Sequence, residues 1–174
     1  MSILASQQEI VGLHDYPAIA PLCATWSYEE WGRHVGDRSL AQVITSYEGY
    51  AENHDSLPQT WINLVEGKPT GMVSLRLRGS HPDVQNFSPW LASLFVYPAF
   101  RGIGIGKRLC SFVVQEAGRY GYRKVYLFTG AAKDFYLRLG WKQIGTVTDP
   151  MKLLLEGDAL MEIETYKKEA ALCK

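Results

Sequence analysis

The residues best suited to chemistry form a glycine-rich turn that follows an apolar strand. Three glycines alternate with isoleucines, and basic residues flank the run: Arg101, Gly102, Gly104, Gly106 and Lys107. Because glycine has no side chain, the backbone N–H groups of such a turn can approach an anion closely. The positive end of the helix that follows adds to this attraction. The spacing therefore predicts a diphosphate-binding site at a strand–loop–helix junction within residues 94–109.

Two common phosphate motifs do not fit this turn. A Walker loop requires glycine where this chain has Arg101, and a magnesium-binding Ser or Thr where it has Arg108. The dinucleotide fingerprint GxGxxG fails as well, because the third glycine, Gly106, comes one place too early. What remains is Arg-x-x-Gly-x-Gly after a strand that ends in Val-x-Pro, and a nucleotide hydrolase is disfavoured.

The remaining pattern resembles the acyl-CoA motif of the GCN5-related N-acetyltransferase (GNAT) superfamily, Gln/Arg-x-x-Gly-x-Gly/Ala. The motif runs from Arg101 to Gly106, and the preceding LFVYP is similar to the fourth strand of that family. A second family signature, Ala-x-x-x-Tyr-x-x-x-Gly-Phe, resembles the run from Ala132 to Trp141, with Trp in place of Phe. The resemblance is firm over residues 90–142, and two motifs in the expected order are more specific than either alone.

This resemblance implies acetyl transfer from acetyl-CoA and assigns a role to each part of the motif. The backbone of the fourth strand would hydrogen-bond the pantetheine arm, and the loop amides would hold the pyrophosphate. The backbone N–H of Val96 would polarise the acetyl carbonyl, a contact worth about 3 kcal/mol of the barrier. The cofactor-binding residues implied in this way are Leu94, Phe95, Val96, Arg101, Gly102, Ile103, Gly104, Ile105, Gly106, Lys107, Thr129 and Tyr136.

Two of these residues come from the later motif region. Tyr136 corresponds to the family's tyrosine that protonates the departing CoA thiolate, and a phenol keeps its proton at neutral pH, so it can act as that general acid. Thr129 stands at the position of a family asparagine that contacts the pantetheine, so a hydroxyl would replace the amide. The family mechanism needs no metal, because the acyl group passes directly from thioester to amine.

The acceptor amine must lose a proton before it attacks, so a base or a chain of waters is required. Glu30, Glu48 and His81 are the candidate bases. Aromatic and acidic side chains interleave in residues 25–31, a mixture that suits a cation pocket and equally suits an amphipathic helix with core tryptophans. The candidate substrate residues in this segment are Trp26, Tyr28, Glu30 and Trp31.

The elements that would position these residues predict an α+β domain with a mixed central β-sheet flanked by helices, the GNAT fold, over residues 1–174. Strands are expected at 9–13, 60–66, 70–78, 90–98, 125–128, 141–147, 152–156 and 159–164. The strands 60–66 and 70–78 form a predicted hairpin, and the apolar run 90–98 is expected to be buried on both faces. Helices are expected from Asp15 and Pro17 towards Glu30, over 38–52 after Asp37, over 104–120 and over 131–140. The 104–120 helix has a predicted apolar stripe of Ile105, Leu109, Phe112, Val113, Ala117 and Tyr120. The last two strands form a predicted hairpin whose exposed edge would allow a homodimer.

Composition narrows the class of protein. The chain has 174 residues, 47% of them hydrophobic, which suits a single soluble domain without a membrane span. Its net charge is zero, yet residues 101–142 contain nine basic and two acidic residues, a distribution that favours one polyanionic ligand plus a cationic one over nucleic acid. The N-terminal residues do not resemble a secretory signal, and three cysteines without ligand spacing favour neither disulfides nor zinc, so we expect a cytoplasmic protein.

These observations predict an N-acetyltransferase that moves an acetyl group from acetyl-CoA to a primary amine by direct attack in a ternary complex. The acidic N-terminal part favours a small cationic molecule as the acceptor. The alternative is a non-catalytic acyl-CoA-binding sensor of the same fold, because the sequence identifies no single base and has Thr129 in place of asparagine.

Overall fold

The computed structural model describes residues 7–32, 38–79, 86–147 and 157–165. The chain divides into two compact units, one formed by residues 1–76 and 91–110 and the other by residues 77–90 and 111–174. Each unit is built around its own strands. Within the described ranges, none of the helices has both the length and the apolar character that crossing a bilayer requires.

The first unit contains four strands in the order β1-β2-β3-β4. They are β1 (Gln8–Gly12), β2 (Gln59–Val65), β3 (Lys68–Arg76) and β4 (Trp90–Val96), of which only Trp90 is counted with the second unit. The strands β2 and β3 form the predicted antiparallel hairpin. The turn centres on Glu66 and Gly67 because both have positive φ angles, 51° and 74°, as a two-residue hairpin turn requires.

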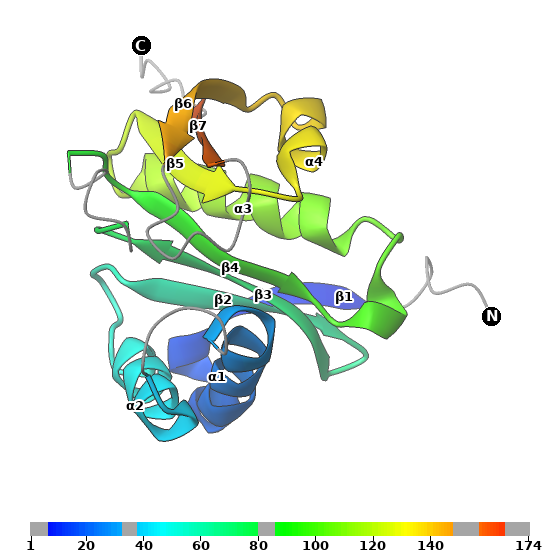
Figure 1. Cartoon of the computed structure of the whole chain (residues 1–174). Helices are drawn as coiled ribbons and strands as arrows, with labels where there is room; N and C mark the ends of the chain where they lie inside the picture. The colour runs from blue at the N-terminus through cyan, green and yellow to red at the C-terminus, as the bar shows by residue number, and fades with distance from the viewer. Residues whose placement is uncertain (1–6, 33–37, 80–85, 148–156, 166–174) are drawn as a thin grey trace, which may run out of the picture. The chain divides into compact units, whose positions relative to one another are not determined.

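The helices α1 (Ala20–Ser27) and α2 (Leu40–Ala51) lie on one side of β2 and β3 (Figure 1). The predicted first helix begins as two 3-10 turns, Leu13–Asp15 and Pro17–Ile19, continues as α1 (Ala20–Ser27) and ends in a π turn, Tyr28–Gly32. The helix α2 (Leu40–Ala51) begins at Ser39, which forms a capping box with Gln42. The helix predicted over 38–52 thus starts two residues later than expected, and Asp37 itself falls outside the described residues. The core of this unit comprises Leu13, Ala20, Cys23, Ala24, Trp26, Val43, Tyr47, Ala51, Ile62, Leu64, Met72 and Phe95.

The second unit contains the strands β5 (Lys124–Thr129), β7 (Asp158–Glu164) and β6 (Lys142–Val147), in that order and antiparallel. Trp90 pairs in parallel with Tyr126, so the sheet is mixed, as predicted. A hydrogen bond from Lys124 to Glu162, 2.7 Å long, joins β5 to β7 and raises the pKa of Lys124. The predicted 159–164 strand offers no free edge, because β7 lies between β5 and β6, and its predicted partner 152–156 falls outside the described residues.

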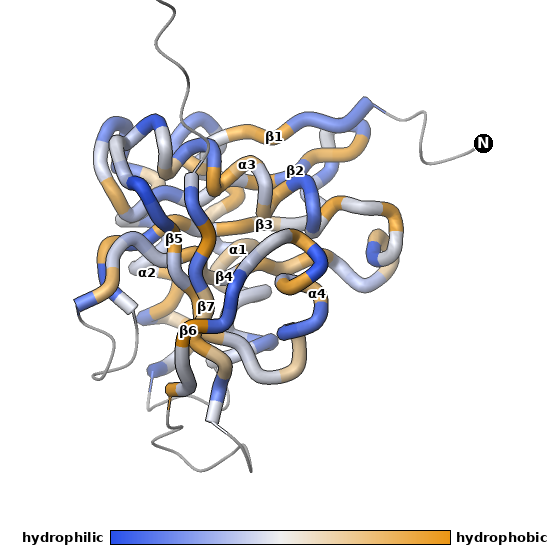
Figure 2. Tube along the Cα trace, turned by 90° about the horizontal axis from the view of Figure 1, so that it is seen from above, coloured by the Kyte–Doolittle hydropathy of each residue, from blue (hydrophilic) through white to orange (hydrophobic). Residues whose placement is uncertain are grey.

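One helix follows β4 and another follows β5. The helix α3 (Ile105–Arg119) has a buried face of Ile105, Leu109, Val113 and Ala117, whose spacing is that of the predicted stripe. The helix α4 (Lys133–Arg138) contains both hydrophilic and hydrophobic residues, as the blue and orange parts of its tube in Figure 2 show, and it buries Tyr136. It is followed by Gly140 at φ 88°, the conformation that commonly ends a helix.

The strand β4 differs from the prediction in length and burial. It ends at Val96, and only Trp90, Leu91 and Phe95 are buried, whereas burial on both faces was expected throughout 90–98. Ser93, in the middle of the strand, has a positive φ of 53°, which interrupts the regular alternation of its side chains. The strand therefore keeps partly exposed residues next to the glycine turn.

Candidate functional site

The predicted phosphate turn lies between β4 and α3. A 3-10 turn (Pro98–Phe100) leads from the strand to Gly102 and Gly104, which have φ angles of 81° and 91°. A Cβ atom at either glycine would meet nothing within 4 Å, so backbone conformation rather than lack of space requires glycine there.

The start of α3 supplies the amides that an anion needs. The N–H of Arg108 donates to the Gly104 carbonyl, 3.0 Å away, at the beginning of the helix. The N–H groups of Ile105, Gly106 and Lys107 precede this bond, in the turn where helix amides have no intrahelical acceptor. An exposed Lys107 beside them adds a positive charge. The arrangement suits a diphosphate.

Arg101, predicted to contact phosphate, is engaged elsewhere in the first unit. Its Nε donates to the Val96 carbonyl at 2.9 Å, and its guanidinium carbon lies 5.9 Å from the centre of the Phe95 ring. Its Nη2 atom is 3.9 Å from Glu30 Oε2. The structure therefore connects Arg101 and Glu30, a predicted cofactor residue and a predicted substrate residue, across the end of β4.

A partly buried polar network, which was not predicted from the sequence, joins the start of α3 to the sheet. Arg108 Nη1 donates to Asn63 Oδ1 at 3.4 Å, and Asn63, fully buried in β2, donates to Thr70 Oγ1 at 2.9 Å. The Thr70 carbonyl in turn accepts from the N–H of Tyr97, 2.9 Å away and directly after β4. The network links both ends of the predicted phosphate turn to the β2–β3 hairpin. An asparagine within the otherwise apolar run WINLV was its one sequence signal.

Close packing supports the same region. A Cβ atom at Gly71 would lie 2.7 Å from the Phe95 carbonyl oxygen and 3.2 Å from a methyl group of Leu109. The strand β3 thus approaches both β4 and the first turns of α3 too closely for a side chain at this position.

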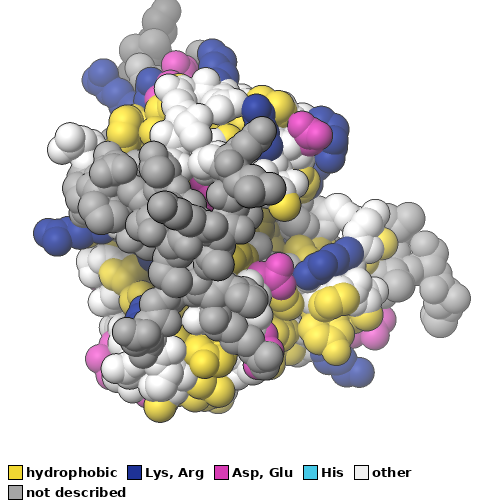
Figure 3. Space-filling model, viewed as in Figure 1, with side chains coloured by type: hydrophobic (Ala, Val, Ile, Leu, Met, Phe, Trp, Pro, Cys, Tyr) yellow, Lys and Arg dark blue, Asp and Glu magenta, His cyan; other side chains and the backbone are white. Residues whose placement is uncertain are grey.

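The four predicted substrate residues have different surroundings. Trp26 is buried in the core and stacks on Phe95, with ring centres 5.1 Å apart, and Tyr28 packs against the same core. Glu30 is exposed and paired with Arg101, and Trp31 is exposed. Figure 3 shows that hydrophobic side chains remain at the surface over α1 and α2. The structure thus favours the core interpretation for Trp26 and leaves Glu30 available as a surface carboxylate.

Of the other candidate bases, Glu48 is exposed on α2 and His81 falls outside the described residues. Within the described ranges, no group of three or more His, Cys, Asp or Glu side chains is arranged to hold a metal ion.

The predicted residues of the second unit occupy packed positions. Tyr136, in α4, is only 7% exposed, and its ring meets those of Phe135 and Trp141 edge-on, at 5.1 and 5.7 Å between centres. Thr129 ends β5, and its hydroxyl accepts from the N–H of Ala132 at 3.3 Å. As an acceptor in that bond, the hydroxyl keeps its own proton available for donation to a ligand.

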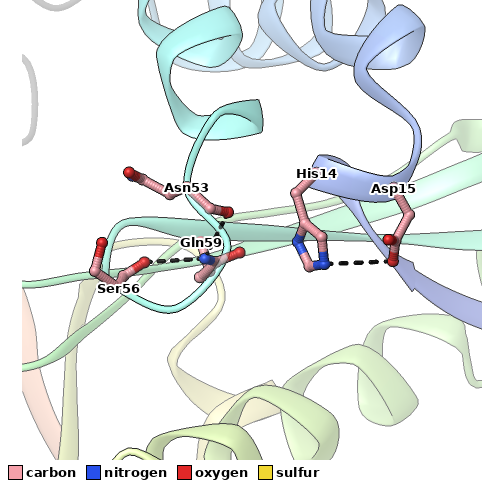
Figure 4. Close-up of polar contacts among 5 residues, drawn as sticks. All are labelled: His14, Asp15, Asn53, Ser56 and Gln59. Atoms are coloured by element: carbon pink, nitrogen blue, oxygen red, sulfur yellow. Dashed lines mark hydrogen bonds and ion pairs between the residues drawn. The ribbon is translucent and has the colours of Figure 1, made fainter.

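A second polar cluster surrounds the loop before β2 (Figure 4). His14 Nε2 lies 3.4 Å from Asp15 Oδ2, and the His14 ring packs edge-on against His54 at 5.2 Å. The Gln59 amide donates to the carbonyls of Asn53 and Ser56, at 2.8 and 2.9 Å. Because Gln59 is almost completely buried, these bonds satisfy its amide and hold the α2–β2 loop in place.

Solved acetyltransferases share this fold. An aminoglycoside 6'-N-acetyltransferase complexed with coenzyme A gives a TM-score of 0.72, covering 92% of this chain and 98% of that chain at 15% identity. An N-acetyltransferase from Staphylococcus aureus Mu50 gives a TM-score of 0.68, covering 92% of this chain and 100% of that chain at 19% identity. At these identities the likeness establishes the fold: a mixed sheet flanked by helices, as the sequence predicted.

Sequence comparison leads from the fold to the family. The family model described as Acetyltransferase (GNAT) family matches residues 20–141, which include parts of both units. A relative in Escherichia coli (strain K12), Uncharacterized N-acetyltransferase YjgM, is 29% identical over 142 residues, 76% of this chain and 79% of the relative. The protein is thus an acyl-CoA-dependent acetyltransferase. The chain belongs to the acetyltransferase (GNAT) family.

Proposed function

We propose that this protein transfers the acetyl group of acetyl-CoA to a primary amine of a small molecule by direct attack within a ternary complex. The observation that carries the proposal is the backbone before α3, where Gly102 and Gly104 have φ angles of 81° and 91°. This conformation turns the chain so that the first amides of α3 can meet a diphosphate. Family membership supports acetyl-CoA as its source.

The proposed cofactor site keeps the residues expected from the sequence. Residues 94–96 of β4 would pair with the pantetheine arm, residues 102–107 would bind the pyrophosphate, and Thr129 would donate its free hydroxyl proton. Arg101 donates to the Val96 carbonyl, whereas the proposal assigns the Val96 N–H to the acetyl group, so the two contacts use different atoms of Val96. Where the cofactor needs this carbonyl, Arg101 can release it at a small cost in free energy, because its side chain is 54% exposed.

The chemical step forms one bond and breaks another. The amine nitrogen attacks the thioester carbonyl carbon, the N–C bond forms, and the C–S bond breaks. The departing thiolate takes a proton from Tyr136, and the amine loses its proton to Glu30, Glu48 or solvent water. The products are an N-acetylated amine and free CoA, so neither an oxidant nor a metal is required for the balance.

The acceptor is proposed to arrive as an ammonium ion. Arg101 already uses the Glu30 carboxylate and the face of Phe95 as partners for its own positive charge. The same two groups suit a substrate cation. A small cationic amine therefore fits these features.

The proposal is tested by comparing two glycines with the same backbone strain. Gly104→Ala and Gly67→Ala both place a side chain at a positive φ, 91° and 74°, with nothing within 4 Å of the new Cβ. Each should lose roughly 1–2 kcal/mol of stability. Only Gly104→Ala should weaken acetyl-CoA binding in calorimetry, by about tenfold or more, because only this residue lies in the proposed phosphate turn. Equal affinities in the two variants would remove the basis of the proposal.

Turnover tests the role of Tyr136. Tyr136→Phe removes the phenolic proton and keeps the ring that packs on Trp141. We expect kcat to fall by roughly 10²-fold with acetyl-CoA affinity nearly unchanged, measured as thiol release with a panel of amines. An unchanged kcat would show that the acid is another group. Release of no thiol with any amine would favour the acyl-CoA sensor instead.

A further inference from the structure

A half-buried arginine occupies the end of β3, outside the machinery described above. Arg76 Nη2 donates to the Ser93 hydroxyl of β4 at 3.1 Å, and its guanidinium carbon lies 5.4 Å from the centre of the Tyr50 ring of α2. Its Nε atom is buried and has no hydrogen-bond partner. Three elements of the first unit thus hold a cation while one of its donors is unused.

Among the described residues, no acidic side chain forms an ion pair with Arg76. Within the described ranges, 7–32, 38–79, 86–147 and 157–165, Arg101 pairs with Glu30, Arg119 with Glu116 and Lys124 with Glu162, but Arg76 forms no ion pair. An arginine cannot lower this cost by losing its proton. Since partly buried charges are normally paired, this position suits an anion supplied by a ligand.

The side chains around Arg76 also have hydrogen-bonding groups that are not in use. Ser93 holds its hydroxyl beside the guanidinium at a φ of 53°, a conformation that costs a non-glycine residue about 1 kcal/mol or more. That hydroxyl accepts from Arg76 and keeps its own proton to donate. Tyr50 packs edge-on against Tyr47, at 5.3 Å, and the buried Tyr47 hydroxyl has no partner either.

The position of this group relates it to the proposed reaction. Ser93 precedes Val96 by three residues on β4, roughly 10 Å at the usual strand rise. Val96 is the residue whose N–H is proposed to polarise the acetyl group. An anion at Arg76 would therefore lie within the length of a small acceptor molecule from the reacting carbon.

We propose, on the basis of the proposed function, that Arg76 and Ser93 bind a carboxylate of the acceptor, which is an amino-acid-type amine. A planar guanidinium with an unused Nε–H matches the two oxygens of a carboxylate, and one positive charge balances its single negative charge. The acceptor then carries two charges, an ammonium group that is acetylated and a carboxylate that orients it.

The test compares acceptors that differ only in this carboxylate. Each amino acid of a panel is assayed beside its carboxamide and its decarboxylated amine, such as lysine, lysinamide and cadaverine. We expect the best amino acid to exceed its amide by roughly 10- to 100-fold in kcat/KM, mainly through KM. Arg76→Gln should reduce this preference to less than about threefold. Arg78→Gln removes an exposed arginine two residues further on and should keep it.

A binding measurement separates this proposal from the proposed function. Thermal shift of the CoA-loaded protein with the same panel needs no turnover, and Ser93→Ala provides a second, milder variant if Arg76→Gln does not fold. Stabilisation by amino acids that depends on Arg76, without thiol release, would support the carboxylate site and contradict acetyl transfer. Equal kcat/KM for amino acids and amides, or a preference that Arg76→Gln leaves intact, would overturn the carboxylate site even in an active enzyme.

Discussion

At the residue scale, the surroundings of a side chain decide its role in this protein, and its residue type alone does not. Glu30 pairs with the same arginine that covers Phe95, whereas Trp26, four residues earlier, is a core residue. Both belong to one aromatic and acidic segment, and the sequence leaves the pocket and core interpretations open for it. Only the burial of each side chain in the structure decides between the two interpretations.

Cys23 gives the residue-scale prediction. Burial raises the pKa of its thiol from 9.0 to about 12. Because the folded pKa exceeds the unfolded one, this contribution to stability is complete below about pH 9 and is lost as the pH rises towards 12. The free energy of unfolding should therefore fall above pH 9 by up to about 1.4 kcal/mol per pH unit more in the native protein than in Cys23→Ala.

Urea denaturation of both proteins at several pH values measures this difference, and titrations common to both cancel. Cys23→Ala should be less stable at neutral pH, by about 1 kcal/mol, because it leaves a small cavity. The two curves should approach each other above pH 9 and then cross, because a fall of up to about 1.4 kcal/mol per pH unit soon exceeds the starting difference. Parallel curves would mean that Cys23 is not the group that titrates.

At the element scale, the sequence predicts those features of helices and strands that a local residue pattern determines. The stripe of α3 and the hairpin of β2 and β3 were predicted to within a few residues, because helix periodicity and a glycine turn are local signals. The glycine turn was located for the same reason. The start of α2 was missed by two residues, since the capping box of Ser39 with Gln42 outweighs the aspartate before it. The network of Arg108, Asn63 and Thr70 includes a contact between distant segments, and the asparagine within WINLV marks only one of its members, so the sequence did not reveal its partners.

Asn63 gives the element-scale prediction. Asn63→Leu has a similar size but removes the bonds to Thr70 and Arg108, so the start of α3 loses its polar connection to β2. We expect a loss of roughly 1–3 kcal/mol in stability and a weaker affinity for acetyl-CoA, by about tenfold, since the proposed diphosphate amides lie in that turn.

Thr60→Val is the matched control for this variant. Thr60 and Ser74 form an equally buried hydrogen bond, 2.8 Å long, between the same two strands, without a link to α3. It should lose comparable stability in urea denaturation and keep its acetyl-CoA affinity in calorimetry. If both variants weaken the cofactor to the same extent, general loosening of the hairpin explains the effect and Asn63 has no positioning role.

At the scale of the whole molecule, the two units share one helix. The helix α3 begins in the first unit and ends in the second, with the division between Cys110 and Ser111. Helix formation is cooperative along the chain, so loss of one half frays the other. The family match over residues 20–141 also takes in both units. Because of the shared helix, we expect the two units to unfold together, as the single domain predicted from length and composition would.

We expect one cooperative unfolding transition, and acetyl-CoA should shift the whole transition to a higher temperature. Circular dichroism at helix wavelengths and the fluorescence of the buried tryptophans, Trp26 and Trp61 in the first unit and Trp90 and Trp141 in the second, should give the same midpoint. At a concentration of about 100 times Kd, acetyl-CoA should add about 2.7 kcal/mol of stability and raise Tm by roughly 5–10 °C. ATP at the same concentration should raise it far less, because the turn lacks the Walker residues. Two separated transitions, of which acetyl-CoA shifts only one, would show that the units unfold independently despite the helix they share.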